Sequence, residues 1–254
     1  MKLLRVVCLL SLACVLIFGQ TGLAAESASS FNWTGPYIGV HMGYGWGNAD
    51  TSFSPRPSAA QFANMAPTTL NPDPSGVVGG LQAGYNYQMG CFVVGLEADF
   101  SGSGMSGTQT VSPIIQNNGV PWPGAGFLRS HQETNWYGTV RPRLGYTVMP
   151  TLLLYGTGGL AYGDVTYSAN SDFRPSGAAF YPASFSKTKV GWAAGGGVEY
   201  ALMKNWTVKV EYLYMDLGSE SVVANPGVPL PPFQVGYKWD TTANLINFGL
   251  NYKF

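Results

Sequence analysis

The chain has 254 residues, a formal net charge of zero at pH 7 and only 10% charged residues, whereas soluble globular proteins carry about 25%. A neutral chain is not expected to bind nucleic acid, because that binding depends on a basic surface. The low charge leaves two classes open: a soluble protein with an unusually uncharged surface, or a membrane β-barrel.

The first 25 residues have the layout of a secretory signal peptide. Lys2 and Arg5 give a basic start, an apolar run covers residues 6–19, and small residues follow at 22–25. The apolar run is shorter than the roughly 20 residues that a membrane-spanning helix needs. We therefore expect a cleaved signal peptide over residues 1–25, and an exported domain over residues 26–254.

Cysteine usage follows from this cleavage. Cys8 and Cys14 would leave with the signal peptide, and Cys91 would remain. A single cysteine cannot form an intrachain disulfide or a cysteine metal cluster. We expect no metal site.

Eight segments alternate between two kinds of side chain with a period of two, as β-strands do. In the first, Ile38, Val40 and Met42 share one face, and Gly39 and His41 lie on the other. The fifth is apolar on both faces, which leaves its orientation open. The eight segments cover residues 33–47, 77–88, 92–101, 136–146, 152–165, 187–200, 206–215 and 245–254.

In the seven segments whose faces can be assigned, every charged residue lies on the second face. A charge at the lipid-facing midplane of a barrel costs about 2–4 kcal/mol for Arg or Lys, so contact with lipid would produce this exclusion. A soluble sandwich would instead carry dense charge on its open face. Because the second face here is rich in glycine, the pattern favours lipid outside and a crowded lumen inside.

The connections alternate in length. Short turns are expected near Met89, Met149 and Met203, and four long linkers cover about 48–75, 103–133, 168–186 and 218–238. These linkers hold 14 of the 17 prolines, and proline cannot donate to a sheet ladder, so we expect loops there. The prediction is an all-β fold: an eight-stranded antiparallel transmembrane β-barrel with short periplasmic turns and four long extracellular loops.

Aromatic residues fall near both ends of the predicted strands, as two belts at the membrane interfaces would require. The short-turn end has Trp33, Phe92, Tyr146, Tyr200, Trp206, Tyr252 and Phe254, and the loop end has Trp46, Phe100, Trp136, Tyr214 and Trp239.

An eight-stranded barrel is just wide enough for side chains to fill. Opposite charges on neighbouring strands predict a lumen ion-pair network, and a narrow conducting path lined by the same residues is the alternative. Other lumen charges are expected at Lys187, Lys189 and Lys253. The predicted network consists of Glu97, Asp99, Arg141, Arg143, Glu199, Lys209 and Glu211.

Catalysis finds little support. The chain has two histidines, His41 expected in the lumen and His131 expected in a loop, and no nucleophile in a recognisable motif. We expect no catalytic residues and no cofactor.

The predicted strands contain the stretches "WTGPYIGVHMGYGWG", "GLEADF", "VRPRLGY", "LLYGTGGLAYG", "GWAAGGGVEYAL", "WTVKVEYLYMDLG" and "INFGLNYKF". These stretches give the chain a resemblance to the opacity-type small outer-membrane β-barrel family, most closely its RopB-like alphaproteobacterial branch. It implies an abundant envelope protein with exposed loops, and a terminal insertion signal at Phe254 read by the barrel-insertion machinery. Pro142 stands where relatives often have a small residue, and we expect a local bulge there.

The expected location is the bacterial outer membrane. The expected function is structural, in envelope integrity, with at most narrow porin-like permeability. The alternative is a surface binding protein whose loops contact a host factor, another cell or haem, and His131 would be the haem ligand. The expected partners are membrane lipid, lipopolysaccharide and the insertion machinery.

Overall fold

A computed structural model describes residues 31–55, 65–66, 69–113, 115–116, 120, 126–172, 180–225 and 234–254. Residues 32–254 form one compact unit. The predicted signal peptide at 1–25 lies outside the described residues and stays a prediction. Within these ranges no helix has the length and hydropathy needed to cross a membrane.

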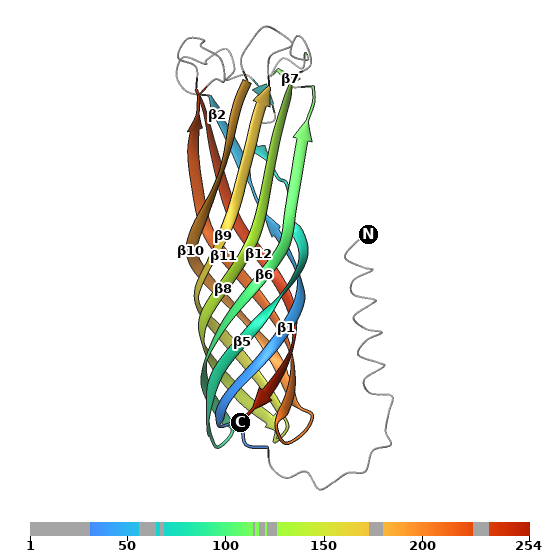
Figure 1. Ribbon diagram of the computed structural model, residues 1–254, viewed down its shortest axis with the longest axis vertical. Helices are drawn as coiled ribbons and strands as arrows, with labels where there is room; N and C mark the ends of the chain where they lie inside the picture. Colours follow the sequence, from blue (N-terminus) through green and yellow to red (C-terminus); the bar gives the residue numbers. More distant parts are fainter. Residues whose placement is uncertain are drawn as a thin grey trace, which may run out of the picture. The chain divides into compact units, whose positions relative to one another are not determined.

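Eight long strands form a closed antiparallel ring, as predicted (Figure 1). Each strand pairs with the next along the chain, and the first closes the ring against the last. The ring consists of β1 (Gly35–Asn48), β5 (Ser75–Met89), β6 (Phe92–Val111), β8 (Phe127–Met149), β9 (Leu152–Asp172), β10 (Phe180–Ala201), β11 (Trp206–Ala224) and β12 (Val235–Lys253).

Four short strands lie within the connections between long strands. They are β2 (Thr51–Pro55), β3 (Met65–Ala66), β4 (Thr69–Leu70) and β7 (Ile115–Gln116). β2 pairs with β12 and with β4, and β3 pairs with β7 in a separate small sheet.

The two faces of each strand lie as the alternation predicts. Met42 points outward with 71% of its surface exposed, whereas His41 beside it points inward and is buried. The structure also orients the fifth segment, β9, whose faces the sequence left open: Leu153 and Tyr155 are buried inside, and Leu160 is exposed outside. A continuous apolar surface therefore surrounds a polar lumen.

The long strands continue well into regions predicted to be loops. This prediction of loop boundaries was wrong for parts of the linkers at 103–133, 168–186 and 218–238, since β6, β8, β9, β10, β11 and β12 all extend into them. The reason is that the alternation inverts there. On β9, Tyr162 points outward, but beyond it the inward residues Val165 and Tyr167 are apolar and the outward residues Thr166 and Ser168 are polar.

We call this outer part of the barrel the extension. It is built like a soluble β-protein, with polar side chains outside and apolar ones inside. Here the ring no longer has all its pairings, because β5 and β6 pair only as far as Ser75 and Ser106. The extension consists of β2, β4 and residues 103–111, 127–135, 164–172, 180–191, 217–224 and 235–243.

The bulge predicted at Pro142 is absent. Leu96 lies opposite Pro142 in the β6 pairing, and the register between β8 and β9 is the same before and after Pro142. Assigned pairing with β9 lapses at Arg141 and Pro142 and resumes at Arg143 opposite Thr157. The missing donor is therefore tolerated as a local gap in the ladder and requires no extra residue.

Candidate functional site

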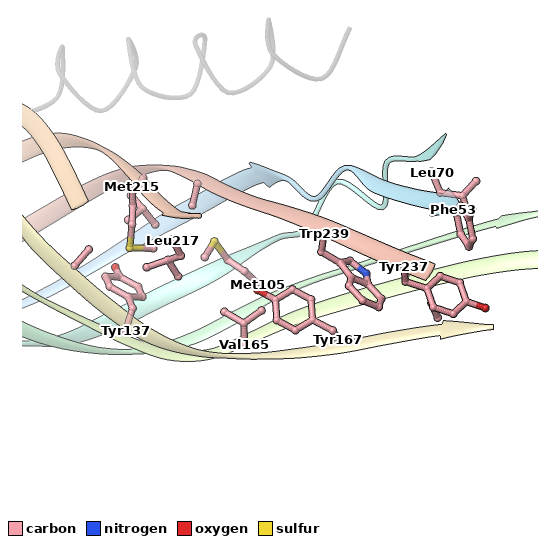
Figure 2. Close-up of a cluster of buried hydrophobic side chains, with 14 of the residues drawn as sticks. Phe53, Leu70, Met105, Tyr137, Val165, Tyr167, Met215, Leu217, Tyr237 and Trp239 are labelled. Carbon is pink, nitrogen blue, oxygen red and sulfur yellow. The ribbon is translucent and has the colours of Figure 1, made fainter. Parts of the chain in front are cut away.

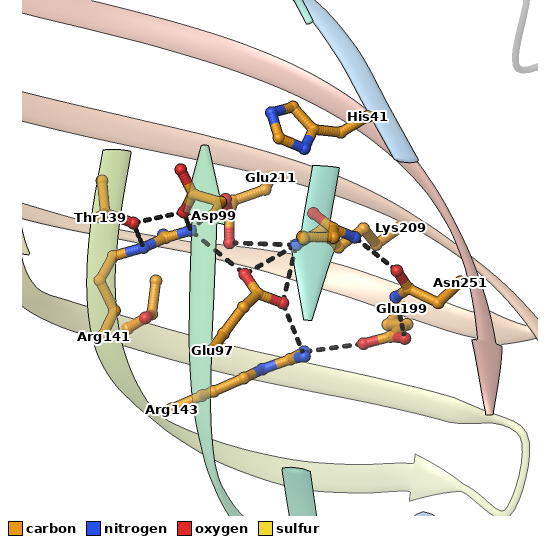
Figure 3. Close-up of polar contacts among 12 residues, drawn as sticks. His41, Glu97, Asp99, Thr139, Arg141, Arg143, Glu199, Lys209, Glu211 and Asn251 are labelled. Atoms are coloured by element: carbon orange, nitrogen blue, oxygen red, sulfur yellow. Dashed lines mark hydrogen bonds and ion pairs between the residues drawn. The ribbon is translucent and has the colours of Figure 1, made fainter. Parts of the chain in front are cut away.

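The centre of the lumen holds a charged cluster around Glu97 on β6 (Figure 3). Its carboxylate accepts bonds from Lys209 on β11 at 2.9 Å and from Arg141 at 3.2 Å. It also accepts bonds from Arg143 at 3.3 Å and from the Tyr37 hydroxyl at 2.7 Å. Glu97 thus ties together four strands around the ring.

The two arginines of β8 extend the cluster in different directions. Arg141 donates to Asp99 and to Glu211, both at 3.1 Å. Arg143 donates to Glu199 at 2.7 Å, and its guanidinium lies 4.0 Å from the centre of the Tyr155 ring. The sequence places these arginines two residues apart on a strand, so both point into the lumen.

All seven residues of the predicted ion-pair network meet in this cluster, and their side chains are no more than 5% exposed. It contains four carboxylates and three cations. Each charge has several partners, as buried charges require. Removing one partner of such a pair typically costs about 3–5 kcal/mol, so the cluster holds its side chains in place.

Besides Tyr37, four more uncharged side chains complete the cluster. Thr139 donates to Asp99 and Tyr155 to Glu211, while Thr207 and Asn251 donate to Glu199. The strand alternation places Tyr37 and Thr139 on the lumen face, but it does not indicate a role for them. Tyr155 was missed because β9 is apolar on both faces, and the only available signal was its hydroxyl group.

Trp33 lies buried at the periplasmic end of the barrel, between the end of β5 and the β8–β9 turn. Its side chain is 1% exposed, its indole N–H donates to the Pro150 carbonyl oxygen at 3.1 Å, and its backbone N–H donates to the Gln88 side chain at 2.9 Å. The prediction that Trp33 belongs to an outer aromatic belt was wrong. It lies just before β1, where the chain has not yet adopted strand alternation.

The extension has an apolar interior (Figure 2). Buried side chains run from Met215 and Tyr137 at its membrane-side boundary to Phe53 and Leu70. The rings of Tyr167 and Trp239 lie between them, tilted by 47° with their centroids 5.4 Å apart. Trp239 is fully buried here, so its predicted place in the outer belt was also wrong. It follows the inverted alternation of the extension.

The two histidines lie in different places. His41 is inside the lumen as expected, with Nε2 2.7 Å from the Ser101 hydroxyl. His131 lies within β8, so its assignment to a loop was wrong. It points outward, with Nδ1 2.8 Å from Thr108 Oγ1 and Nε2 3.8 Å from Glu133. Its role as a haem ligand stays a prediction.

No group of three or more His, Cys, Asp or Glu side chains suited to a metal ion occurs in the described part of the chain. Cys91 is exposed in the β5–β6 turn. Lys187 and Lys189 lie away from the central cluster and bond to Glu220 in the extension.

Known proteins resemble this chain over most of its length. The model of the outer membrane protein beta-barrel domain family matches residues 10–254. The 31 kDa outer-membrane immunogenic protein of Brucella melitensis is 38% identical over 94% of this chain and 91% of its own length. The 22 kDa outer membrane protein of Rhizobium leguminosarum is 33% identical over 70% of this chain and 67% of its own length.

Among solved structures, the outer membrane protein OprG from Pseudomonas aeruginosa matches 89% of this chain and 99% of its own, at 14% identity and a TM-score of 0.49. With a closed eight-stranded ring, an apolar outer surface and a family match that covers nearly every residue, this chain belongs to the outer membrane protein beta-barrel domain family and is a protein of the bacterial outer membrane.

Proposed function

We propose that this protein is a structural component of the outer membrane whose barrel is closed to solutes. The observation that carries the proposal is the filling of the lumen in three successive layers. Trp33 lies buried at the periplasmic end, the Glu97 cluster fills the centre, and the apolar cluster fills the extension.

Opening a path through the centre would be costly. The charged side chains there bond to one another across the lumen, and a solute would have to replace those bonds in a region of low dielectric constant. At the boundary with the extension, the cavity beside Met105 and Gln132 has a volume of about 10 Å³, which is room for one water molecule. These features support a closed barrel rather than a narrow porin.

The outer surface supports a role in the lipid layer. Outward apolar side chains cover the strands between two levels of aromatic rings, which include Phe92 and Phe254 at one end and Phe100 and Trp192 at the other. Such a band matches the hydrocarbon region and its two interfaces. We therefore propose membrane lipid and lipopolysaccharide as the immediate partners.

Planar-bilayer recording tests the closed barrel. We expect purified protein to insert without producing stable conductance steps, while a general porin in the same bilayer produces them. Reproducible steps of uniform size from the wild-type protein would contradict the proposal.

The structural role has a separate test. A strain that lacks the protein should become more sensitive to detergent, and the wild-type gene should restore resistance.

A second role, binding of an external partner, is favoured by the extension. It lies at the end of the barrel opposite the short turns, and the Brucella relative is named an immunogenic protein. If haem is the ligand and His131 binds it, titration of wild type and of His131→Ala should give different curves. Coincident curves would remove His131 from this role.

A further inference from the structure

The wall of the extension is interrupted between β10 and β11. These strands pair from Ala201 opposite Thr207 as far as Trp192 opposite Asp216. Beyond that point β10 stays paired with β9, and β11 stays paired with β12. No pairing between β10 and β11 continues in the described residues. We call this interruption the seam; it runs between residues 182–191 of β10 and 218–224 of β11.

Charged side chains bridge the base of the seam. Lys187 and Lys189 of β10 reach Glu220 of β11 at 2.8 and 3.0 Å, and Lys189 also donates to the Ser219 carbonyl oxygen at 2.6 Å. These bonds take the place of ladder bonds. The Lys187 side chain remains 53% exposed, so the bridge is open to water.

Farther from the membrane the seam is lined by apolar side chains. Ala183 and Phe185 on β10 and Val222 on β11 pack against the apolar cluster, but they are only partly buried. Phe185 contacts the Trp239 ring at 5.6 Å. The interior of the extension therefore reaches the surface along the seam, where a neighbouring molecule could cover it.

Both sides of the seam are strand edges. An edge presents backbone N–H and C=O groups at the spacing of another strand, so a polypeptide strand is the occupant it fits best. Pro182 removes one donor, and the two inward lysines disfavour an apolar strand. A strand that brings a carboxylate to the level of the lysines is favoured. Residues 218–224 of a second copy are such a strand, because they carry Glu220.

We propose that two copies of this chain associate through their seams. The membrane holds both copies in the same orientation, so a two-fold axis must lie along the membrane normal. Rotation about that axis brings β10 of one copy against β11 of the other. The two strands run in opposite directions, so they pair as antiparallel strands, and both junctions are identical.

This arrangement exchanges bonds that each chain makes within itself. Lys187 and Lys189 pair with Glu220 of the partner subunit, and the exposed parts of Phe185 and Val222 become covered. The favourable free energy of association comes from backbone pairing along the strand edges and from burial of the apolar surface, because the ion pairs are only exchanged. Each strand edge of the two seams thereby gains a paired strand.

Disulfide formation between two single-cysteine variants tests the proposal. Both carry Cys91→Ser, which removes the one cysteine of residues 26–254. One has a cysteine on the outer face of β10, at Ser186 or Thr188, and the other on the outer face of β11, at Ser219 or Ser221. The two are co-expressed with tags of different mass and oxidised in the outer membrane.

We expect a disulfide-linked heterodimer from at least one combination of a β10 variant with a β11 variant. Each variant expressed alone should give much less dimer, because the two-fold axis separates identical strands. Absence of heterodimer from every combination would overturn the proposal. Equal crosslinking by each variant alone, or crosslinking to a polypeptide of another mass, would also overturn it.

A charge reversal gives a second readout. Glu220→Lys places like charges opposite Lys187 and Lys189. A monomer can relieve this repulsion because its unpaired edges are open to water, whereas paired strands in the dimer hold the charges together. We therefore expect the dimer that the wild type forms in lipid nanodiscs to become a monomer in the variant, by native mass measurement. A gel-mobility shift on heating shows that the variant barrel is folded. A folded variant that remains as dimeric as the wild type would contradict the proposal.

Discussion

Gly39 shows how tightly the residues of the lumen fit. An added Cβ would overlap the side-chain oxygen of Asn251 and lie 2.6 Å from the Leu250 carbonyl oxygen. We predict that Gly39→Ala lowers the free energy of unfolding by about 1–3 kcal/mol, the usual cost of overpacking. Gly156→Ala is the matched control, because its Cβ would have no heavy atom closer than 3.9 Å.

Urea unfolding of both glycine variants in lipid vesicles gives the comparison. We expect Gly156→Ala to be neutral or to stabilise by up to about 1 kcal/mol, because alanine restricts the unfolded chain. If Gly39→Ala were equally harmless, the close fit between β1 and β12 would be refuted.

Glu97 is the residue on which the central cluster depends most. Glu97→Gln keeps the shape of the side chain but leaves Arg141, Arg143 and Lys209 with one carboxylate fewer. We predict a loss of about 3–5 kcal/mol in the free energy of unfolding, as for other buried pairs that lose a partner. Glu133→Gln removes an exposed carboxylate 3.8 Å from His131 and should cost less than about 1 kcal/mol.

At the residue scale, the sequence predicted which side chains face the lumen but not which of them meet. The alternation of side chains along each strand is enough to place Glu97 and Gly39 inside. Contacts across the lumen depend also on the tilt and stagger of the strands, which no single segment encodes. The space beside Gly39 and Gly43, for example, is occupied by the side chains of Asn251 and Asn247 from β12.

At the element scale, the seam between β10 and β11 should respond to acid. Hydrogen bonds from two lysines, Lys187 first and Lys189 second in size of effect, hold the pKa of Glu220 below its ordinary value. A lowered pKa in the folded state gives stability that is complete above the unfolded pKa of about 4.3. That stability is lost as the pH falls through the lowered pKa.

The corresponding variant is Glu220→Gln, which removes the titrating group. We predict that the wild type is the more stable protein at pH 7 and that the difference shrinks as the pH falls below about 4.3. Urea unfolding of both proteins between pH 7 and pH 3 measures it, and other titrating groups cancel in the comparison. A difference independent of pH would show that the lysines do not hold Glu220 as an anion.

The strands were predicted correctly only where outward-facing side chains are apolar. Within the membrane, outward residues are apolar, and this rule located the eight strands and oriented seven of them. In the extension, water replaces lipid and the rule reverses. The predicted strand therefore ended at Val165 and a loop was expected from residue 168, although β9 continues to Asp172. Proline did not mark the strand ends either, since Pro182 lies inside β10.

At the scale of the whole molecule, ring closure was predictable because each strand pairs with its neighbour in sequence. Among the eight long strands that the structure describes, the β1–β12 pairing is the one that joins distant parts of the chain, with Ile38 opposite Tyr252. Side chains that meet across the lumen were expected from the number of strands. The seam could not be predicted, because much of it lies in regions predicted to be loops and because the feature that defines it is a missing pairing between two strands.

Assembly of the whole barrel provides the last prediction, at Phe254. Its ring is 63% exposed on the outer surface and contacts Tyr252 at 5.2 Å, so Phe254→Ala should hardly change the stability of the folded barrel. If Phe254 is an insertion signal, the variant should accumulate several-fold less in the outer membrane yet refold normally in lipid vesicles. Phe92→Ala is the matched control, because Phe92 is also 63% exposed and contacts Tyr146 at 5.6 Å. Equal loss of both variants from the membrane would assign the effect to the aromatic belt. A recognition signal depends on the residue at one position, whereas all residues of a belt should contribute alike.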